Sequence, residues 1–145
     1  MIFEYKNAKT NRTMAYNFFI NKNSTLPSLR MEAINDGRHD FSKLSIALQS
    51  ADVYFTMTNI DNGIKKVSNA KADVVLMENS ICEEKYIIEY KWKERDTKTP
   101  GVYKGEFKIV FDGNLKADNI CLPKGELIVP ISQELMIHVM NGSVK

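Results

Sequence analysis

Hydrophobic and polar residues alternate with a period of two along several short stretches of this chain. The clearest stretch is residues 97–111, TKTPGVYKGEFKIVF, where every second residue from Tyr103 to Phe111 falls on one face. The opposite face carries Lys104, Glu106 and Lys108. This pattern predicts a strand with one buried face and one solvent-exposed face. Asp112-Gly113 supplies a turn signal at its end.

A turn signal also precedes this strand, because Pro100 pre-sets one backbone angle and Gly101 tolerates a positive one. The spacing Gly101-x-Tyr103-x-Gly105 matches the outline of a tyrosine corner, in which a tyrosine hydroxyl bonds to backbone a few residues upstream. We therefore expect Tyr103 to be buried and bonded to backbone within residues 96–100. The segment as a whole predicts an immunoglobulin-like sandwich.

The same alternation predicts strands at residues 14–20, 29–33, 53–59, 64–67, 72–78, 85–93, 126–131 and 135–140. Asp61-Asn62-Gly63 is a hairpin signal between two of them. In the stretch 85–93, Trp92 falls on the inward face with Tyr90, and Glu89 falls on the outward face. Helical periodicity is weak and allows a short helix within residues 42–50 and another within residues 132–135.

These signals predict an all-β, immunoglobulin-like antiparallel β-sandwich of about seven to nine strands. Its expected structural residues are Trp92, Tyr103, Gly101, Gly105 and Phe107. We divide the chain into residues 1–25, an N-terminal arm or first strand, and residues 26–145, the sandwich domain. Five N-terminal aromatic residues are candidate interface residues, since they either join the core or pack on a neighbouring subunit. They are Phe3, Tyr5, Tyr16, Phe18 and Phe19.

Composition narrows the function classes. The 145 residues are 43% hydrophobic and 26% charged, which is typical of one globular domain. The net charge of +2 and the scattered lysines argue against nucleic-acid binding. No apolar run reaches the ~20 residues that cross a membrane, and the N-terminus does not resemble a signal peptide. We expect synthesis in a reducing cytoplasm, with Cys82 and Cys121 as free thiols.

Each candidate chemical site has a simpler structural interpretation. Residues 36–40, DGRHD, contain His39 and read as a solvated loop, and His138 falls in the last predicted strand, facing water or an interface. Residues 61–63 and 112–114 resemble calcium-loop fragments but lack the alternating oxygen ligands, so they read as turns. We interpret two acidic pairs, Glu83 with Glu84 and Glu94 with Asp96, as charged residues at strand ends. We therefore expect no catalytic, metal or cofactor site, and no enzyme.

Four blocks carry a resemblance to a known family: residues 51–57 (ADVYFTM), 90–97 (YKW with DT), 99–107 (TPGVYKGEF) and 127–131 (LIVPI). In this order and spacing they resemble the immunoglobulin-like N-terminal domain of phage baseplate upper proteins. They are still more similar to small virion proteins of tailed phages, including crAss-like gut phages, that carry this domain alone. The resemblance covers about residues 26–139.

The resemblance implies a structural role in a virion and no catalysis. Other virion structural proteins are the expected partners, and a homo-oligomer is an open alternative. Baseplate proteins of this kind continue into a long further portion, so a small capsid, head-fibre or other decoration or adaptor subunit is the expectation. A tail or baseplate adaptor is one alternative. A carbohydrate-binding sandwich that adheres to host or mucosal glycans is another, which the inward position of Trp92 disfavours.

Overall fold

The computed structural model describes residues 2–5, 15–34, 47–48, 50–78, 84–112, 124–130 and 133–141. Within these ranges, the side chains of residues 2–5, 15, 33–34, 77–78, 84–86 and 112 are not described. Nine strands and one 3-10 turn make up most of this part of the chain. The prediction of an all-β fold with about seven to nine strands is thus confirmed.

Except at residues 2–5, where alternation predicted no strand, the strands follow the predicted positions closely. They are β1 (Ile2–Tyr5), β2 (Ala15–Asn21), β3 (Leu29–Ile34), β4 (Asp52–Asn59), β5 (Lys65–Glu78), β6 (Glu84–Tyr90), β7 (Gly101–Asp112), β8 (Lys124–Val129) and β9 (Glu134–Met140). The 3-10 turn η1 (Glu94–Thr97) lies between β6 and β7. The predicted strand 85–93 ends early, at Tyr90.

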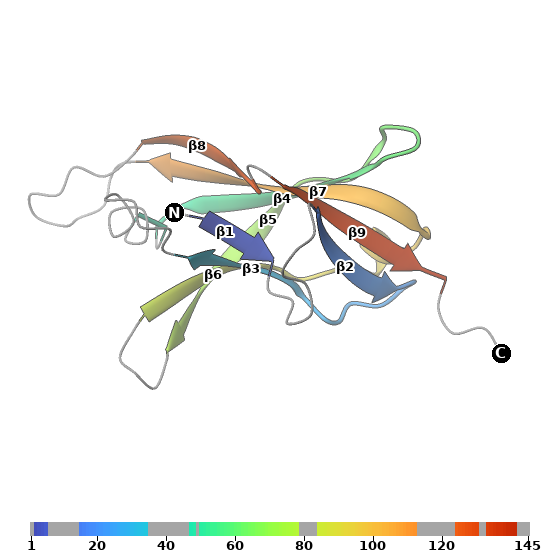
Figure 1. The fold of residues 1–145 in the computed structure, drawn as a ribbon, viewed down its shortest axis with the longest axis horizontal. Coiled ribbons are helices and arrows are strands. Elements are labelled where there is room, and N and C mark those ends of the chain that lie inside the picture. Colours follow the sequence, from blue (N-terminus) through green and yellow to red (C-terminus); the bar gives the residue numbers. More distant parts are fainter. Residues whose placement is uncertain are drawn as a thin grey trace, which may run out of the picture.

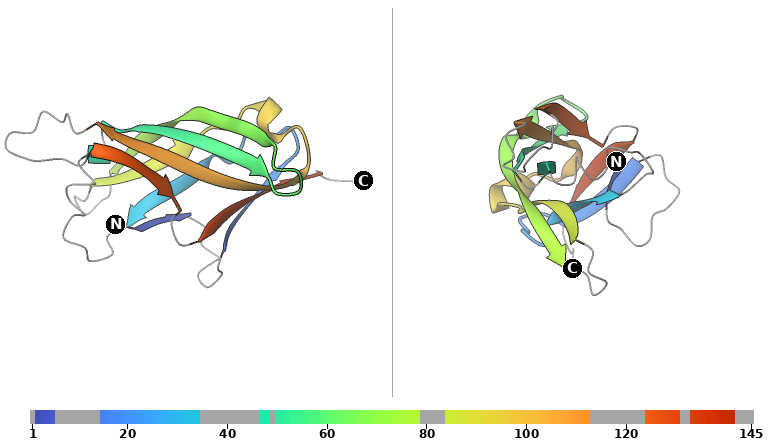
Figure 2. Two further views of the ribbon diagram at one scale, coloured as in Figure 1. Left: turned by 90° about the horizontal axis from the view of Figure 1, so that it is seen from above. Right: turned by 90° about the vertical axis from the view of Figure 1, so that its left-hand side faces the viewer.

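The strands pair in the order β1-β3-β6-β5-β4-β7-β9-β2, and β8 pairs with β7 off this path. In an immunoglobulin-type sandwich, strands A, B, E and D form one sheet and strands C, F and G form the other. Here β1, β3, β6 and the end of β5 take the first set of places, and β4, β7 and β9 take the second. Figures 1 and 2 show the two curved layers closing toward a barrel around a shared interior.

Two features depart from a purely antiparallel sandwich. Strand β2 pairs with β9 in parallel, with Ala15 opposite Glu134 and Asn21 opposite Met140. Strand β5 also belongs to both layers, because its first part pairs with β4 and residues from Asp73 onward pair with β6. The predicted strands 64–67 and 72–78 are therefore one strand, bent near Asn69, where φ is 49° and the register with β4 shifts.

The core lies between the two layers and is centred on aromatic rings. The ring of Phe55 on β4 lies 4.6 Å from Tyr90, 5.0 Å from Phe107 and 5.6 Å from Trp92, measured between centroids. Strand β7 contributes every second residue from Tyr103 to Phe111, all of them buried, as its sequence predicts. Ala47 and Leu48 form a short helical segment that is buried inside the ring of strands (Figure 2).

Candidate functional site

The predicted tyrosine corner is present at the start of β7. Tyr103 is 1% exposed, and its hydroxyl donates a hydrogen bond of 2.6 Å to the carbonyl of Thr99. The side-chain amide of Asn59 also hydrogen-bonds this hydroxyl, and burial raises the pKa of Tyr103 more than that bond lowers it. Gly101 has a φ of 152°, in a region that favours glycine. The corner therefore ties the start of β7 to the end of β4.

Gly105 lets β7 approach its neighbours closely. A Cβ atom at this position would lie 3.1 Å from Phe55 Cε1, 3.2 Å from Leu135 Cδ2 and 3.3 Å from Ile137 Cδ1. In antibody domains this place, two residues after the corner tyrosine, holds a disulfide-forming cysteine. Here the ring of Phe55 packs over the glycine instead, and Phe107 continues the same buried row.

Trp92 lies beyond the end of β6 but is still buried, at 4% exposed, as predicted. Its ring meets Tyr90 edge-on at 5.3 Å and lies 5.7 Å from Phe18 of β2. The only tryptophan of the chain is thus part of the core.

Asp96 is a buried residue that the sequence interpretation assigned to a charged strand end. Its Oδ2 accepts a hydrogen bond of 2.6 Å from the Tyr90 hydroxyl and one of 2.9 Å from the Lys93 backbone N–H. Burial, followed by these contacts with Asp96, raises the pKa of Tyr90 well above its ordinary value. The interpretation was wrong for Asp96 because η1 turns this carboxylate inward to meet Tyr90.

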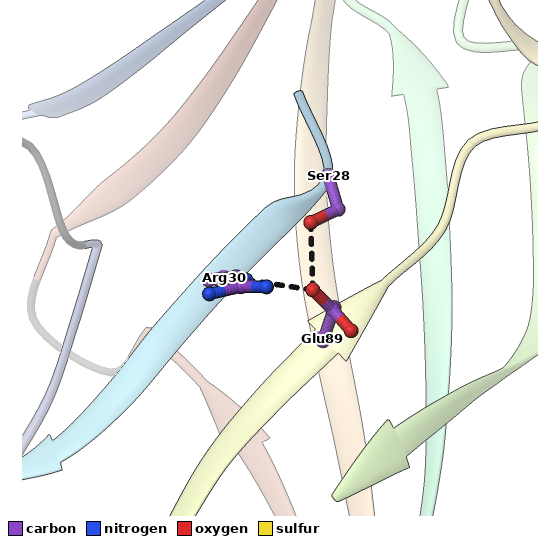
Figure 3. A network of polar contacts seen from close by, with 3 residues as sticks. All are labelled: Ser28, Arg30 and Glu89. Carbon is purple, nitrogen blue, oxygen red and sulfur yellow. Dashed lines mark hydrogen bonds and ion pairs between the residues drawn. The ribbon is translucent and has the colours of Figure 1, made fainter. Parts of the chain in front are cut away.

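Glu89 is also buried, at 5% exposed, although alternation places it on the outward face of β6. Its Oε2 accepts hydrogen bonds from Ser28 Oγ at 2.7 Å and from Arg30 Nε at 2.6 Å (Figure 3). Burial alone would raise the pKa of Glu89, but the bonds from Ser28 and Arg30 and the charges of Arg30 and Lys91 lower it overall. Alternation within β6 could not predict this site, because Arg30 lies in β3 and Ser28 directly before it.

The five candidate interface residues lie in three different settings. Phe3 and Tyr5 are in β1, opposite Ala33 and Met31 of β3, and their side chains lie outside the described ones. Phe18 is buried and Tyr16 packs partly on the core. Phe19 points outward and is 55% exposed. Both β1 and β2 belong to the sheet, as its two terminal strands.

Phe19 stacks on His138 across the parallel β2–β9 pair, with ring centroids 4.6 Å apart. His138 Nε2 lies 2.9 Å from Asn17 Oδ1, and partial burial lowers the pKa of His138. The histidine therefore has a hydrogen-bond partner and an aromatic partner on the outer surface of the sheet.

Four exposed large hydrophobic residues belong to strand ends and a hairpin that lie at one end of the molecule. This end is formed by the last residues of β2, β4 and β9 and by the hairpin between β4 and β5, at the right of Figure 1. The Lys22 N–H donates to the Met140 carbonyl and so joins the ends of β2 and β9. The Ile60 N–H donates to the Val102 carbonyl and joins the hairpin to the start of β7, which pairs with the end of β9. We call these four residues, Phe19, Ile60, Ile64 and Met140, the apolar end.

The remaining chemical candidates divide into a confirmed turn and residues outside the described ranges. Residues 61–63 form the predicted hairpin turn, in which Asn59 Oδ1 accepts a hydrogen bond of 2.8 Å from the Asp61 N–H. Cys82, Cys121, residues 36–40, residues 113–114 and Glu83 lie outside the described residues. Within the described ranges, no three His, Cys, Asp or Glu side chains are placed to hold a metal ion. No helix in this part of the chain has the length and apolar character to cross a membrane.

Comparison with known proteins adds no relative. Neither a scan against protein-family models nor a search of curated proteins found a match to the chain.

Proposed function

We propose that this protein is a structural component of a tailed-phage virion, a small immunoglobulin-like decoration or adaptor subunit of the capsid or head fibre. It acts through contacts with other virion proteins and performs no catalysis. The observation that carries the proposal is the apolar end, and the family resemblance of residues 51–57, 99–107 and 127–131 supplies the setting.

The apolar end has the character of a contact surface. Ile64 is 64% exposed and Ile60 51% exposed, although both side chains are large and apolar. Single exposed hydrophobic residues are common on monomeric proteins, whereas a contiguous apolar patch marks an interaction site. We propose that the four residues of the apolar end form such a patch. In a symmetric particle each contact is repeated, so a modest surface is sufficient for stable incorporation.

A glycan-binding role has weaker support. Sugar-binding sandwiches present tryptophan or tyrosine on an exposed sheet face. Here Trp92 is buried, and the ring of Tyr54 on the outward face of β4 has Lys71 and Lys108 over it. The tail or baseplate adaptor differs from our proposal only in the position of the subunit in the particle, and it is one of the outcomes of the experiment below.

The test is an inventory of purified phage particles by mass spectrometry and cryo-electron microscopy. We expect the protein in many copies on washed virions, with its apolar end against another structural protein. A variant Ile60→Ser/Ile64→Ser should fold normally and load poorly onto particles. The matched control is Leu76→Ser, which removes an exposed hydrophobic residue of β5 outside the apolar end.

A second variant tests the N-terminal segment. Deletion of residues 1–13 removes β1, a terminal strand that pairs with β3 alone among the described strands. We expect a folded domain with reduced incorporation. Intact virions that contain none of the protein, while it persists free in infected cells, would refute the proposed function.

A further inference from the structure

Strand β2 is the less protected of the two terminal strands of the sheet. A terminal strand offers unpaired N–H and C=O groups to other chains, and proteins usually protect it by short length, charge, proline or a bulge. Strand β1 has four residues, one of which is Glu4. Strand β2 has seven residues without charge, proline or glycine, and its register with β9 is unbroken. Of the two, β2 is therefore better suited to pair with a further strand.

The backbone groups at this edge can be assigned from one hydrogen bond. The Lys22 N–H donates to the Met140 carbonyl at 2.8 Å, on the side of β9 (Figure 1). Hydrogen-bonding groups alternate between the two sides of a strand, so those of Asn17, Phe19 and Asn21 point away from β9. Among the described strands, none pairs with β2 on that side. We call these three residues the open edge.

The open edge ends where the chain turns. The Asn23 N–H donates to the Thr97 carbonyl of η1 on this same side, so a partner strand has room only up to Asn21. The Asn21 carbonyl accepts a hydrogen bond from the Ser24 N–H, and its second lone pair is available to a partner.

The sequence of this edge is nearly self-complementary. Residues 17–21 read NFFIN, which has the same character in both directions around Phe19. When two copies of β2 lie antiparallel about Phe19, this residue meets its own equivalent, Asn17 meets Asn21, and Phe18 meets Ile20. A two-fold contact requires such self-matching. No charge meets a like charge, which would destabilise the pair.

We propose that two copies of this protein associate by antiparallel pairing of their β2 strands about a two-fold axis at Phe19. The open edges exchange backbone hydrogen bonds, and the Phe19 rings, each 55% exposed, cover each other. Each ring is held in position by its stack on His138 of the same chain, at 4.6 Å between centroids. Cross-strand aromatic pairs of this kind stabilise a sheet.

The expected dimer is weak because its ladder is short. Residues 17–21 span about 17 Å at ~3.4 Å per residue. We therefore expect dissociation in the range of about 10 µM to about 1 mM. The inference goes beyond the proposed function and does not depend on it. In a symmetric particle the same contact would be strengthened by repetition.

The experiment is sedimentation velocity of the full-length protein with reductant present, at concentrations up to about 1 mM. We expect a monomer–dimer equilibrium. Phe19→Lys places two like charges opposite each other at the axis, so it should weaken dimerisation by on the order of tenfold or more while the NMR spectrum stays dispersed. The matched control is Leu76→Lys, which makes the same change at an exposed residue of β5 and should dimerise like the wild type.

Cysteine cross-linking tests the register in a Cys82→Ser/Cys121→Ser background. A mixture of Asn17→Cys chains and Asn21→Cys chains should form a disulfide-linked dimer under mild oxidation, because directly opposed Cα atoms lie about 5.5 Å apart. Chains with Asn17→Cys alone should not, since antiparallel pairing separates the two cysteines. A monomer at every concentration, a dimer unaffected by Phe19→Lys, or equal cross-linking of Asn17→Cys alone would overturn the proposal.

The outcomes separate this inference from the proposed function. Ile60→Ser/Ile64→Ser leaves β2 unchanged and should dimerise normally, although we expect it to load poorly onto particles. If virions contain the protein but it stays monomeric in solution, the β2 contact fails and the virion role stands. If the β2 dimer forms in the expected register but washed virions lack the protein, the contact stands and the virion role fails.

Discussion

Replacement of Tyr103 by phenylalanine tests whether the tyrosine corner stabilises this sandwich. The substitution keeps the buried ring and removes only the hydroxyl, which donates to the Thr99 carbonyl at 2.6 Å and receives a bond from the Asn59 amide. Asn59 also caps the hairpin turn after β4 through its Oδ1. The substitution therefore removes the side-chain link between the start of β7, the loop at Thr99 and the hairpin turn after β4.

The expected cost follows from these two hydrogen bonds. Each contributes about 0.5–1.5 kcal/mol net, so the free energy of unfolding should fall by about 1–3 kcal/mol. Thr99 is exposed, so water can reach its vicinity, which places the expected value in the lower half of that range. For a domain of this size the melting temperature should fall by about 3–8 °C.

Urea unfolding followed by tryptophan fluorescence measures this cost directly. The midpoint should move to lower urea with an unchanged slope, since the exposed surface on unfolding stays the same. Tyr54→Phe is the matched control: this ring is half-buried, on the outward face of β4, and packs under Lys71 and Lys108. Its stability should change by less than about 0.5 kcal/mol. If Tyr103→Phe is as stable as the control, the corner does not stabilise the fold and the reasoning is refuted.

Three further predictions concern the core and the buried polar groups. Gly105→Ala should destabilise the protein by about 1–3 kcal/mol in chemical denaturation, because the added methyl group meets three core side chains; an unchanged midpoint would show that the core relaxes freely. Glu89 has a lowered pKa in the folded state, so its stabilising contribution is present above the ordinary value of 4.5 and is lost as pH falls through the folded value. Wild-type protein should therefore lose more stability than Glu89→Gln between about pH 5 and about pH 3, and parallel melting curves would contradict this. Tyr90 has a raised pKa, so its contribution is lost as pH rises above the ordinary value of 10.0. Melting temperatures of Tyr90→Phe should consequently fall less steeply than those of the wild type above that pH, and identical slopes would count against a buried, protonated Tyr90.

Local patterns were sufficient to predict most strands and the tyrosine corner. Alternation located β7, and the Gly101-x-Tyr103 spacing located the Thr99 contact, because both depend on residues near each other in the sequence. The burial of Glu89 depends on Ser28, 61 residues away, and no property of β6 alone indicates that partner.

Predictions also failed where the backbone changes direction. The bend of β5 near Asn69 made one strand read as two, and η1 turned Asp96 inward at a place where alternation no longer applies. Strand β7 pairs first with β9 and then with β8, and no periodic signal in β7 indicates that change of partner.

The parallel pairing of β2 with β9 has a consequence for how the protein is made. Asn17 and His138, which meet across this pair, are 121 residues apart in the chain. On the ribosome, β2 is synthesised long before β9. The backbone N–H and C=O groups of β2 that pair with β9 therefore stay unpaired while the strands between them are made. Contacts of such long range carry a large loop-closure entropy and are typically formed late and slowly. During that interval the aromatic face of β2, with Phe18 not yet buried, would be a binding site for chaperones and a starting point for aggregation.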